Sequence, residues 1–231
     1  MLRRTFVVGD IHGCLDELCV LLSGIPLAAG DRTVFVGDYI DRGPDSRGVV
    51  DRLLALAADP ARECVFLRGN HEDMLLAYLG RGGHYGEAFL ANGGDATAES
   101  YGIGDPTPAE LMAAIPAEHL RFFEETKLTH VEDGYVIVHA GIHPRRDLNH
   151  QSAHDLLWIR DEFIRRPHDL GQTVVFGHTP SRSVYVDLPY KIGIDTGCVY
   201  GGRLTALELP SRALHSVRRG APTVERSELP A

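Results

Sequence analysis

The most constraining feature of this 231-residue sequence is a pattern that occurs three times in its first third. A short apolar run ends in Gly-Asp or Gly-Asn, and the first two of these turns lead into stretches with helical spacing. The runs and the turns after them are Thr5-Phe-Val-Val8 with Gly9-Asp10, Thr33-Val-Phe-Val36 with Gly37-Asp38, and Cys64-Val-Phe-Leu67 with Arg68-Gly-Asn70. Near-continuous runs of Val and Phe are typical of strands that are buried on both faces of a sheet. We therefore predict an α/β fold.

The intervening stretches have the spacing of amphipathic helices. Apolar residues share one face in Cys14–Leu22 and in Ser46–Ala57, and Asp45 or Ser46 can cap the second helix. Later strands are expected at Tyr135–His139, Val174–Phe176, Val184–Val186, Lys191–Ile194 and Leu204–Leu209. The last three leave no room for long helices between them, which predicts a second, more antiparallel sheet.

The length suits a single domain with one core. We assign residues 1–217 to this domain, with a helical insertion at about 78–130. Gly80-Arg-Gly-Gly83 and Asn92-Gly-Gly94 interrupt the pattern there, and Thr107-Pro-Ala-Glu110 has the form of a capping box that opens a helix. Residues 218–231 are polar and contain proline, so this tail is expected to fray.

Composition and charge narrow the classes of function. The formal net charge is −9, and an acidic chain lacks the lysine and arginine excess that binding to nucleic acid requires. No stretch approaches the roughly 18 apolar residues of a membrane span. The N-terminal apolar run is too short for a signal peptide, so the cytoplasm is the expected compartment. A phosphate-handling site on such a chain needs local positive charge, which bound metal ions supply.

Potential metal ligands follow five of the expected strands, at the edge where layered α/β folds gather their ligands. They are Asp10, His12, Asp38, Asn70, His139 and His178. Carboxylate, amide and imidazole donors without a thiolate suit Mn²⁺, Fe or Zn²⁺. Six ligands are too many for one catalytic ion that keeps a position open for water, but they suit two divalent ions that share a bridging carboxylate.

Five segments resemble, in order, the motifs of the PPP-type metallophosphoesterases, which comprise the protein serine/threonine phosphatases and their bacterial and phage relatives. They are Gly9-Asp-Ile-His-Gly13, Gly37-Asp-Tyr-Ile-Asp-Arg-Gly43, Arg68-Gly-Asn-His-Glu72, His139-Ala-Gly141 and Gly177-His178. The resemblance spans about residues 5–209. It implies a calcineurin-like metallophosphoesterase fold, that is, a layered mixed β-sandwich flanked by helices.

The resemblance also implies residue roles. Asp10, His12 and a bridging Asp38 would hold one metal ion, most simply Mn²⁺. Asp38, Asn70, His139 and His178 would hold the other. Arg42 and Arg68 match phosphate-contacting arginines, and Trp158-Ile-Arg160 is similar to a tryptophan-x-arginine motif of phage-type members. Asp195-Thr-Gly197 is similar to the C-terminal strand region of bacterial members.

Residue chemistry supports two further roles. A proton donor at the leaving oxygen assists phosphate ester hydrolysis, and His71 is the candidate. Asp41 is placed to orient His71 and to raise its pKa. The guanidinium forks of Arg42, Arg68 and Arg160 match phosphate geometry. Two plainer interpretations stay open: Glu72 only favours a helix start, and Arg160 only pairs with the adjacent Asp161 or Glu162.

Three functions are compatible with these motifs. The first is a phosphomonoesterase, acting on phosphorylated proteins or small phosphoesters, with phosphoserine, phosphothreonine and phosphotyrosine all open. The second is a hydrolase of diadenosine tetraphosphate or a similar nucleotide anhydride. The third is a non-catalytic metal-binding scaffold. The presence of Asp41 and the short stretch from His139 to Gly177 favour the first.

Overall fold

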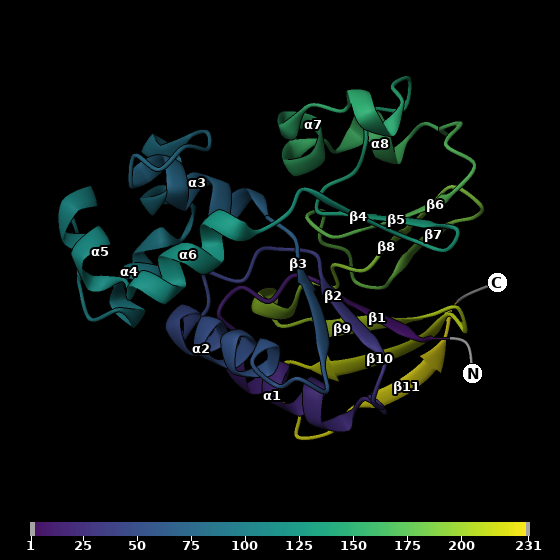
Figure 1. Cartoon of the computed structure of the whole chain (residues 1–231), viewed down its shortest axis with the longest axis horizontal. Coiled ribbons are helices and arrows are strands. Elements are labelled where there is room, and N and C mark those ends of the chain that lie inside the picture. The colour runs from purple at the N-terminus through teal and green to yellow at the C-terminus, as the bar shows by residue number, and fades with distance from the viewer. Residues whose placement is uncertain (1–2, 230–231) are drawn as a thin grey trace.

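Two mixed β-sheets face each other in the computed structural model, which describes residues 3–229 (Figure 1). The strand order is β11-β10-β9-β1-β2-β3 in the first sheet and β4-β5-β6-β8-β7 in the second. Helices α1 (Leu15–Gly24) and α2 (Ser46–Ala57) lie below the first sheet in this view, and α7 (Ala153–Trp158) and α8 (Asp161–Ile164) lie above the second. The layered α/β fold is confirmed.

The strands of the two sheets have short and well-defined bounds. The first sheet consists of β1 (Thr5–Val8), β2 (Arg32–Phe35), β3 (Glu63–Phe66), β9 (Arg203–Leu209), β10 (Ala213–Arg218) and β11 (Glu225–Glu228). The second consists of β4 (Thr129–Glu132), β5 (Tyr135–Val138), β6 (Thr173–Phe176), β7 (Tyr185–Asp187) and β8 (Lys191–Gly193). β1, β2 and β3 pair in parallel, as do β5, β6 and β8. In each parallel set, the carboxyl ends therefore lie at one edge of the sheet.

The core has three apolar layers because strand side chains alternate between the two faces of a sheet. In β1, Phe6 and Val8 pack in the layer that contains α1 and α2, whereas Val7 packs between the two sheets. Ile137 of β5 reaches the same middle layer from the second sheet. Phe176 of β6 packs outward in a cluster with Phe163 of α8. β1 and most of β2 are thus buried on both faces, as their sequences predict, whereas β3, at the edge of the first sheet, is only partly buried.

The C-terminal part differs from the prediction in two ways. β9 does not join the second sheet; it pairs antiparallel with β1 and β10 in the first. Its buried residues on both faces suit this central position. The expected frayed tail contains β11, which pairs antiparallel with β10. β11 is exposed and polar because it is an edge strand, so it carries no apolar pattern that would reveal it.

Helices fill most of the segment between β3 and β4 and lie beyond the strand ends, on the left of Figure 1. They are α3 (Asn70–Tyr78), η1 (Gly86–Ala88), η2 (Leu90–Asn92), α4 (Gly94–Ser100), α5 (Pro108–Ala114) and α6 (Ala117–Glu125). The predicted capping box opens α5, with Thr107 as its N-cap and Glu110 bonded back to it. This insertion therefore borders the edge where the ligand-bearing turns lie.

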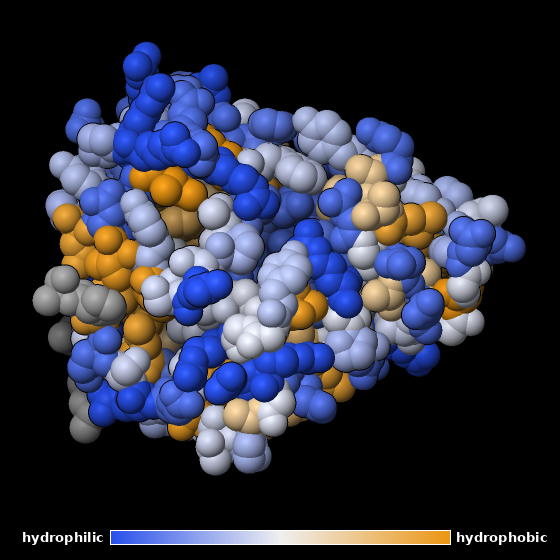
Figure 2. Space-filling view, turned by 180° about the vertical axis from the view of Figure 1, so that it is seen from behind, coloured by the Kyte–Doolittle hydropathy of each residue, from blue (hydrophilic) through white to orange (hydrophobic). Residues whose placement is uncertain are grey.

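Seen from behind, the molecule narrows toward one side, and hydrophilic side chains cover much of its middle (Figure 2). Within residues 3–229, the helices are all too short or too polar to cross a membrane.

Candidate active site

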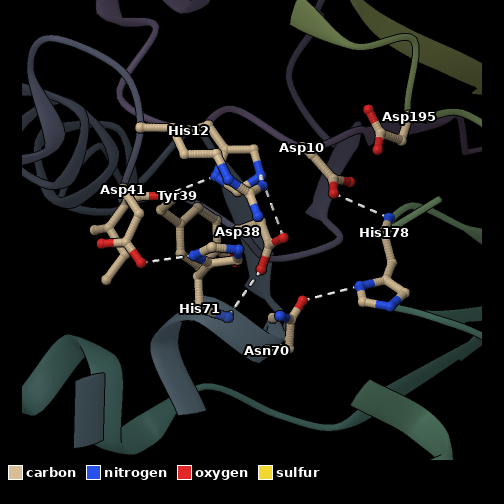
Figure 3. Close-up of polar contacts among 12 residues, drawn as sticks. Asp10, His12, Asp38, Tyr39, Asp41, Asn70, His71, His178 and Asp195 are labelled. Carbon is tan, nitrogen blue, oxygen red and sulfur yellow. Dashed lines mark hydrogen bonds and ion pairs between the residues drawn. The ribbon is translucent and has the colours of Figure 1, made fainter. Parts of the chain in front are cut away.

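The six predicted ligands come together at the carboxyl ends of strands from both sheets, and Figure 3 labels all of them except His139. Asp10 and His12 follow β1, Asp38 follows β2, and Asn70 begins α3 after β3. His139 and His178 follow β5 and β6 in the second sheet. The site is therefore built across the junction of the two sheets, and all six side chains are buried.

Asp38 lies at the centre of this cluster. Its Oδ2 is 3.4 Å from Nε2 of His12, and its Oδ1 is 3.4 Å from Nε2 of His139. Burial alone would raise the pKa of the Asp38 carboxyl, but His139, His71 and His12 hold that pKa well below its usual range. The Asp38 carboxyl group thus lies between imidazoles from the two sheets.

Backbone contacts orient the imidazoles. Nδ1 of His12 lies 2.8 Å from the carbonyl oxygen of Ile40, and Nδ1 of His139 lies 2.9 Å from that of Val36. Each Nδ1 therefore donates its hydrogen to a carbonyl, which leaves the lone pair of each Nε2 available to a cation beside Asp38. Neutral imidazole is the form that binds metal, and burial lowers the pKa of His12 to about 3.

The backbone is strained where these side chains are displayed. Of the eight non-glycine residues with positive φ between residues 3 and 229, five belong to this region: His12, Asp38, Asp41, Arg42 and His178. Such conformations cost about 1–3 kcal/mol each and persist only where the surrounding structure fixes them. Gly37 and Gly69 let the turns after β2 and β3 approach each other closely, because a Cβ on Gly37 would lie 2.3 Å from the Gly69 nitrogen. This concentration of strain is typical of a functional site.

Glu72 fixes the turn that presents Asp38, a role that the sequence did not reveal. Its carboxylate accepts hydrogen bonds from the backbone amides of Asp38 at 2.9 Å, Tyr39 at 2.8 Å and Gly69 at 2.9 Å. The bond to Gly69 caps α3, as the plainer interpretation expects of a first-turn glutamate. The other two bonds reach the turn after β2, and local sequence spacing gives no signal of them. Burial, together with the charge of Asp38, raises the pKa of Glu72 to about 7.

His71 and Asp41 form a buried pair, with Nδ1 of His71 2.6 Å from Oδ2 of Asp41. The other Asp41 oxygen accepts a 2.6 Å hydrogen bond from Thr97 of α4. Burial by itself lowers the pKa of His71, but the charge of Asp38 and the bond to Asp41 outweigh it and raise that pKa. The helical insertion thus contributes Thr97, which the sequence analysis missed, to hold Asp41 in place.

Two predicted phosphate ligands lie beside the cluster with exposed side chains. Nη1 of Arg42 is 2.7 Å from Nε2 of His12. Within the described chain Arg160 forms no ion pair: Asp161 pairs with Arg165 and Glu162 with Arg166. The positive charge of Arg160 contributes to the lowered pKa of His139, after burial and the charge of His71. Both guanidinium groups are thus exposed, and their phosphate-binding roles stay predictions.

Arg68 points partly away from the cluster, so its phosphate-binding role stays a prediction. Its Nε donates to Oγ1 of Thr126 at 3.0 Å, and its Nη2 donates to the carbonyl of Glu124 at 3.0 Å. These bonds tie the guanidinium to the end of α6. The motif predicts an exposed fork, whereas the polar groups at the end of this helix engage it instead.

Asp195 is a further buried carboxylate, beyond the end of β8. Burial and the charge of Asp38 raise the pKa of Asp195 to about 6. Burial and the charges of Asp195 and Asp38 likewise raise the pKa of Asp10 well above its usual value. The sequence analysis gave Asp195 no role, although the position of Asp195 after a strand end was a signal that it could belong to the site.

The cluster has the properties of a cation site. Several buried carboxylates lie close together without matching positive charge, which is costly unless cations bind. Oδ1 of Asp10 and Nε2 of His178 are buried and have no hydrogen-bond partner among the described residues. Two groups of ligand atoms share Asp38, one with His12 and His71 and one with His139 and His178. The residues therefore fit two divalent ions bridged by Asp38.

The distribution of ligands within the first group differs in one respect from the predicted set. His71, rather than Asp10, lies with His12 and Asp38, while Oδ2 of Asp10 accepts a 2.9 Å bond from the His178 amide. His71 is already paired with Asp41, so its place in the group does not exclude the role of proton donor.

Comparison with known proteins agrees with the fold and the site. Residues 3–209 match the family of calcineurin-like phosphoesterases. The chain is 30% identical to the asymmetrical bis(5'-nucleosyl)-tetraphosphatase PrpE of Anoxybacillus flavithermus, over 94% of this chain and 95% of that protein. It is 31% identical to the protein of the same description from Geobacillus thermodenitrificans, with the same coverage.

Solved structures give the same result. One assigned provisionally to a diadenosine tetraphosphatase superposes with a TM-score of 0.72 at 28% identity, covering 94% of this chain and 93% of that one. A cold-active protein tyrosine phosphatase of a psychrophilic Shewanella has a TM-score of 0.64 at 17% identity, covering 98% and 80%, and shares the fold alone. The resemblance to PPP-type metallophosphoesterases is confirmed, and the chain belongs to the calcineurin-like phosphoesterase family.

Proposed function

We propose that this phosphoesterase hydrolyses bis(5'-nucleosyl) tetraphosphates asymmetrically, with water as the second substrate. The observation that carries the proposal is the similarity, along nearly the whole of both chains, to proteins described as asymmetrical bis(5'-nucleosyl)-tetraphosphatases. This reverses the ranking that the sequence motifs alone favour, in which a phosphomonoesterase comes first. An asymmetrical cut of diadenosine tetraphosphate yields one nucleoside monophosphate and one nucleoside triphosphate.

We assign the metal ligands as the motifs predict. Asp10, His12 and Asp38 would hold one ion, and Asp38, Asn70, His139 and His178 the other. Oxygen and imidazole donors favour Mn²⁺, with Fe or Zn²⁺ as alternatives. When bound, two such ions lower the pKa of a coordinated water and neutralise phosphoryl oxygens.

The other residues act on the substrate itself. Arg42 and Arg160 bind and orient phosphoryl oxygens, because exposed guanidinium groups beside the cluster match the geometry and charge of phosphate. His71 gives a proton to the leaving phosphate oxygen. Asp41 positions the His71 ring and favours its protonated form, and Thr97 in turn fixes Asp41.

A phosphomonoesterase remains the second candidate, favoured by the His71–Asp41 pair. A protonated donor is most useful where the leaving group is a poorly stabilised alkoxide, as in a phosphate monoester of serine or threonine. This activity would use the same residues, with a folded protein segment or a small phosphoester as substrate.

A substrate panel in the presence of Mn²⁺ tests the proposal. It compares kcat/KM for diadenosine tetraphosphate, p-nitrophenyl phosphate and phosphoserine, phosphothreonine and phosphotyrosine peptides, with chromatography of the nucleotide products. We expect the dinucleotide to be preferred and to give AMP and ATP. A preference for any phosphopeptide would favour the second candidate, and two molecules of ADP would exclude asymmetrical cleavage.

A further inference from the structure

Exposed aromatic side chains adjoin the candidate active site. Among residues 3–229 the large hydrophobic side chains that stand exposed are Tyr85 at 44%, Val131 at 51% and Tyr200 at 61%. Val131 lies on the edge strand β4, but both tyrosines contact residues of the site or their immediate neighbours. A flat ring that the protein leaves uncovered beside a phosphate-binding group is suited to stack on a planar ligand.

Tyr200 belongs to the phosphate-binding side of the cluster. It ends η4 (Cys198–Tyr200), the turn that follows Asp195. The guanidinium carbon of Arg42 lies 5.7 Å from the centre of the Tyr200 ring, and Arg42 reaches His12 at 2.7 Å. The guanidinium covers part of the ring, and the large exposed fraction of Tyr200 leaves the remainder open to a ligand.

Tyr85 reaches the cluster from the helical insertion. Its ring packs edge-to-face on Trp158 of α7, with centroids 5.0 Å apart, and the Trp158 ring lies 6.3 Å from that of His178. The Tyr85 backbone has a φ of +58°, which is unfavourable for an aromatic residue. The fold thus holds a half-exposed ring in a strained conformation, next to a side chain that contacts a predicted metal ligand.

The two tyrosines adjoin the cluster through different residues. Tyr200 connects through Arg42 to His12, and Tyr85 connects through Trp158 to His178. Figure 3 shows His12 and His178 on either side of Asp38. A dinucleoside polyphosphate has the matching form, with a planar base at each end of a chain of phosphates.

We propose that Tyr200 and Tyr85 are stacking platforms for the two nucleobases of a dinucleoside polyphosphate, with its phosphate chain lying across Asp38 between them. The inference rests on the proposed function and adds the residues that recognise the bases. Stacking of a base on an aromatic side chain strengthens binding by roughly 5- to 150-fold and tolerates any base. The site would therefore select substrates with two bases without distinguishing adenine from guanine sharply.

Substitution of each ring tests the inference. Tyr200→Leu and Tyr85→Leu remove the ring but keep apolar bulk, whereas the Phe variants retain stacking. We measure KM for diadenosine tetraphosphate and the inhibition constant of inorganic tetraphosphate, which has the same phosphates without bases. We divide the KM for diadenosine tetraphosphate by the inhibition constant of inorganic tetraphosphate. In each Leu variant we expect this ratio to rise by roughly 5- to 150-fold, and in each Phe variant we expect it to change by less than about 2-fold. Val131→Ala, at the exposed position away from the site, is the control.

Intrinsic fluorescence gives an independent readout, because Trp158 is the single tryptophan of the chain. We expect the dinucleotide to quench Trp158 more than inorganic tetraphosphate does, and Tyr85→Leu to weaken that response. Suppose that the wild type hydrolyses the dinucleotide, but both Leu variants have the same ratio of KM to inhibition constant and the same Trp158 quenching as the wild type. The stacking inference is then wrong and the proposed function stands. If the wild type neither binds nor hydrolyses it, both are overturned.

Discussion

The carboxylate of Glu72 accepts a 2.9 Å hydrogen bond from the backbone amide of Asp38, and this bond joins the first turn of α3 to the turn after β2. The same carboxylate accepts hydrogen bonds from the backbone amides of Tyr39 and Gly69. The position of Asp38, the central predicted ligand, therefore depends on a residue that belongs to no predicted ligand set.

Glu72→Gln should destabilise the fold, because the amide group turns an NH₂ toward backbone N–H donors that need an acceptor. We expect a loss of about 1–3 kcal/mol in the free energy of unfolding, measured by urea denaturation with EDTA present. Glu118→Gln is the matched control, since Glu118 is an exposed glutamate in the first turn of α6. Equal stability of the two variants would show that the Glu72 bonds contribute nothing.

His71→Asn should reduce kcat by about 10²- to 10⁴-fold, the usual contribution of a positioned proton donor. Metal content, measured by mass spectrometry, should stay at the wild-type level. His150→Asn changes an exposed histidine outside the site and should leave kcat unaltered. Normal turnover in His71→Asn would exclude the proton-donor role.

The arginines should separate into two classes. Loss of a charged hydrogen bond to substrate costs about 1.5–3 kcal/mol, so Arg160→Ala should lower kcat/KM by about 10- to 100-fold. Arg68→Ala should mainly lower the melting temperature, because its bonds to Thr126 and Glu124 hold the end of α6. If Arg68→Ala kept its stability and lost substrate affinity, the original sequence prediction for Arg68 would be restored.

His168 should make stability depend on pH. Burial lowers the pKa of His168, despite the bond to the Tyr190 carbonyl, and the charge of Lys191 lowers it further. The unfolded chain, with a pKa of about 6.5, therefore takes up the proton first. The contribution of neutral, buried His168 to the free energy of unfolding is complete above about pH 6.5 and is lost as the pH falls toward the pKa in the folded state. Between pH 7.5 and 5, with EDTA present, unfolding free energy should fall less in His168→Gln than in the wild type. Equal slopes would contradict this account.

The sequence predicted those parts of the fold that depend on local patterns. Buried runs such as Thr5–Val8 have a clear apolar signal, and the turns after them carry the ligands. β11 had no such signal because an edge strand can be polar on both faces. The place of β9 beside β1 is a pairing between distant segments, which spacing along the chain does not encode.

The site was predictable where its residues occur in motifs. Thr97 contacts Asp41 from the insertion, 56 residues away, so its role depends on how α4 packs. Arg68 belongs to a motif, yet the side chain turns toward α6 because polar groups there satisfy its donors. Motifs therefore identified the residues that cluster at the strand ends, and tertiary contacts decided which neighbours support them.

Metal stoichiometry of Asp38→Asn tests the central claim most directly, because this single side chain belongs to both groups of potential metal ligands. The wild type should hold about two ions per chain, and the variant should lose occupancy at both positions, whereas Asp10→Asn should lose it mainly at one. An Asp38→Asn protein that still bound two ions with unchanged affinity would contradict the account.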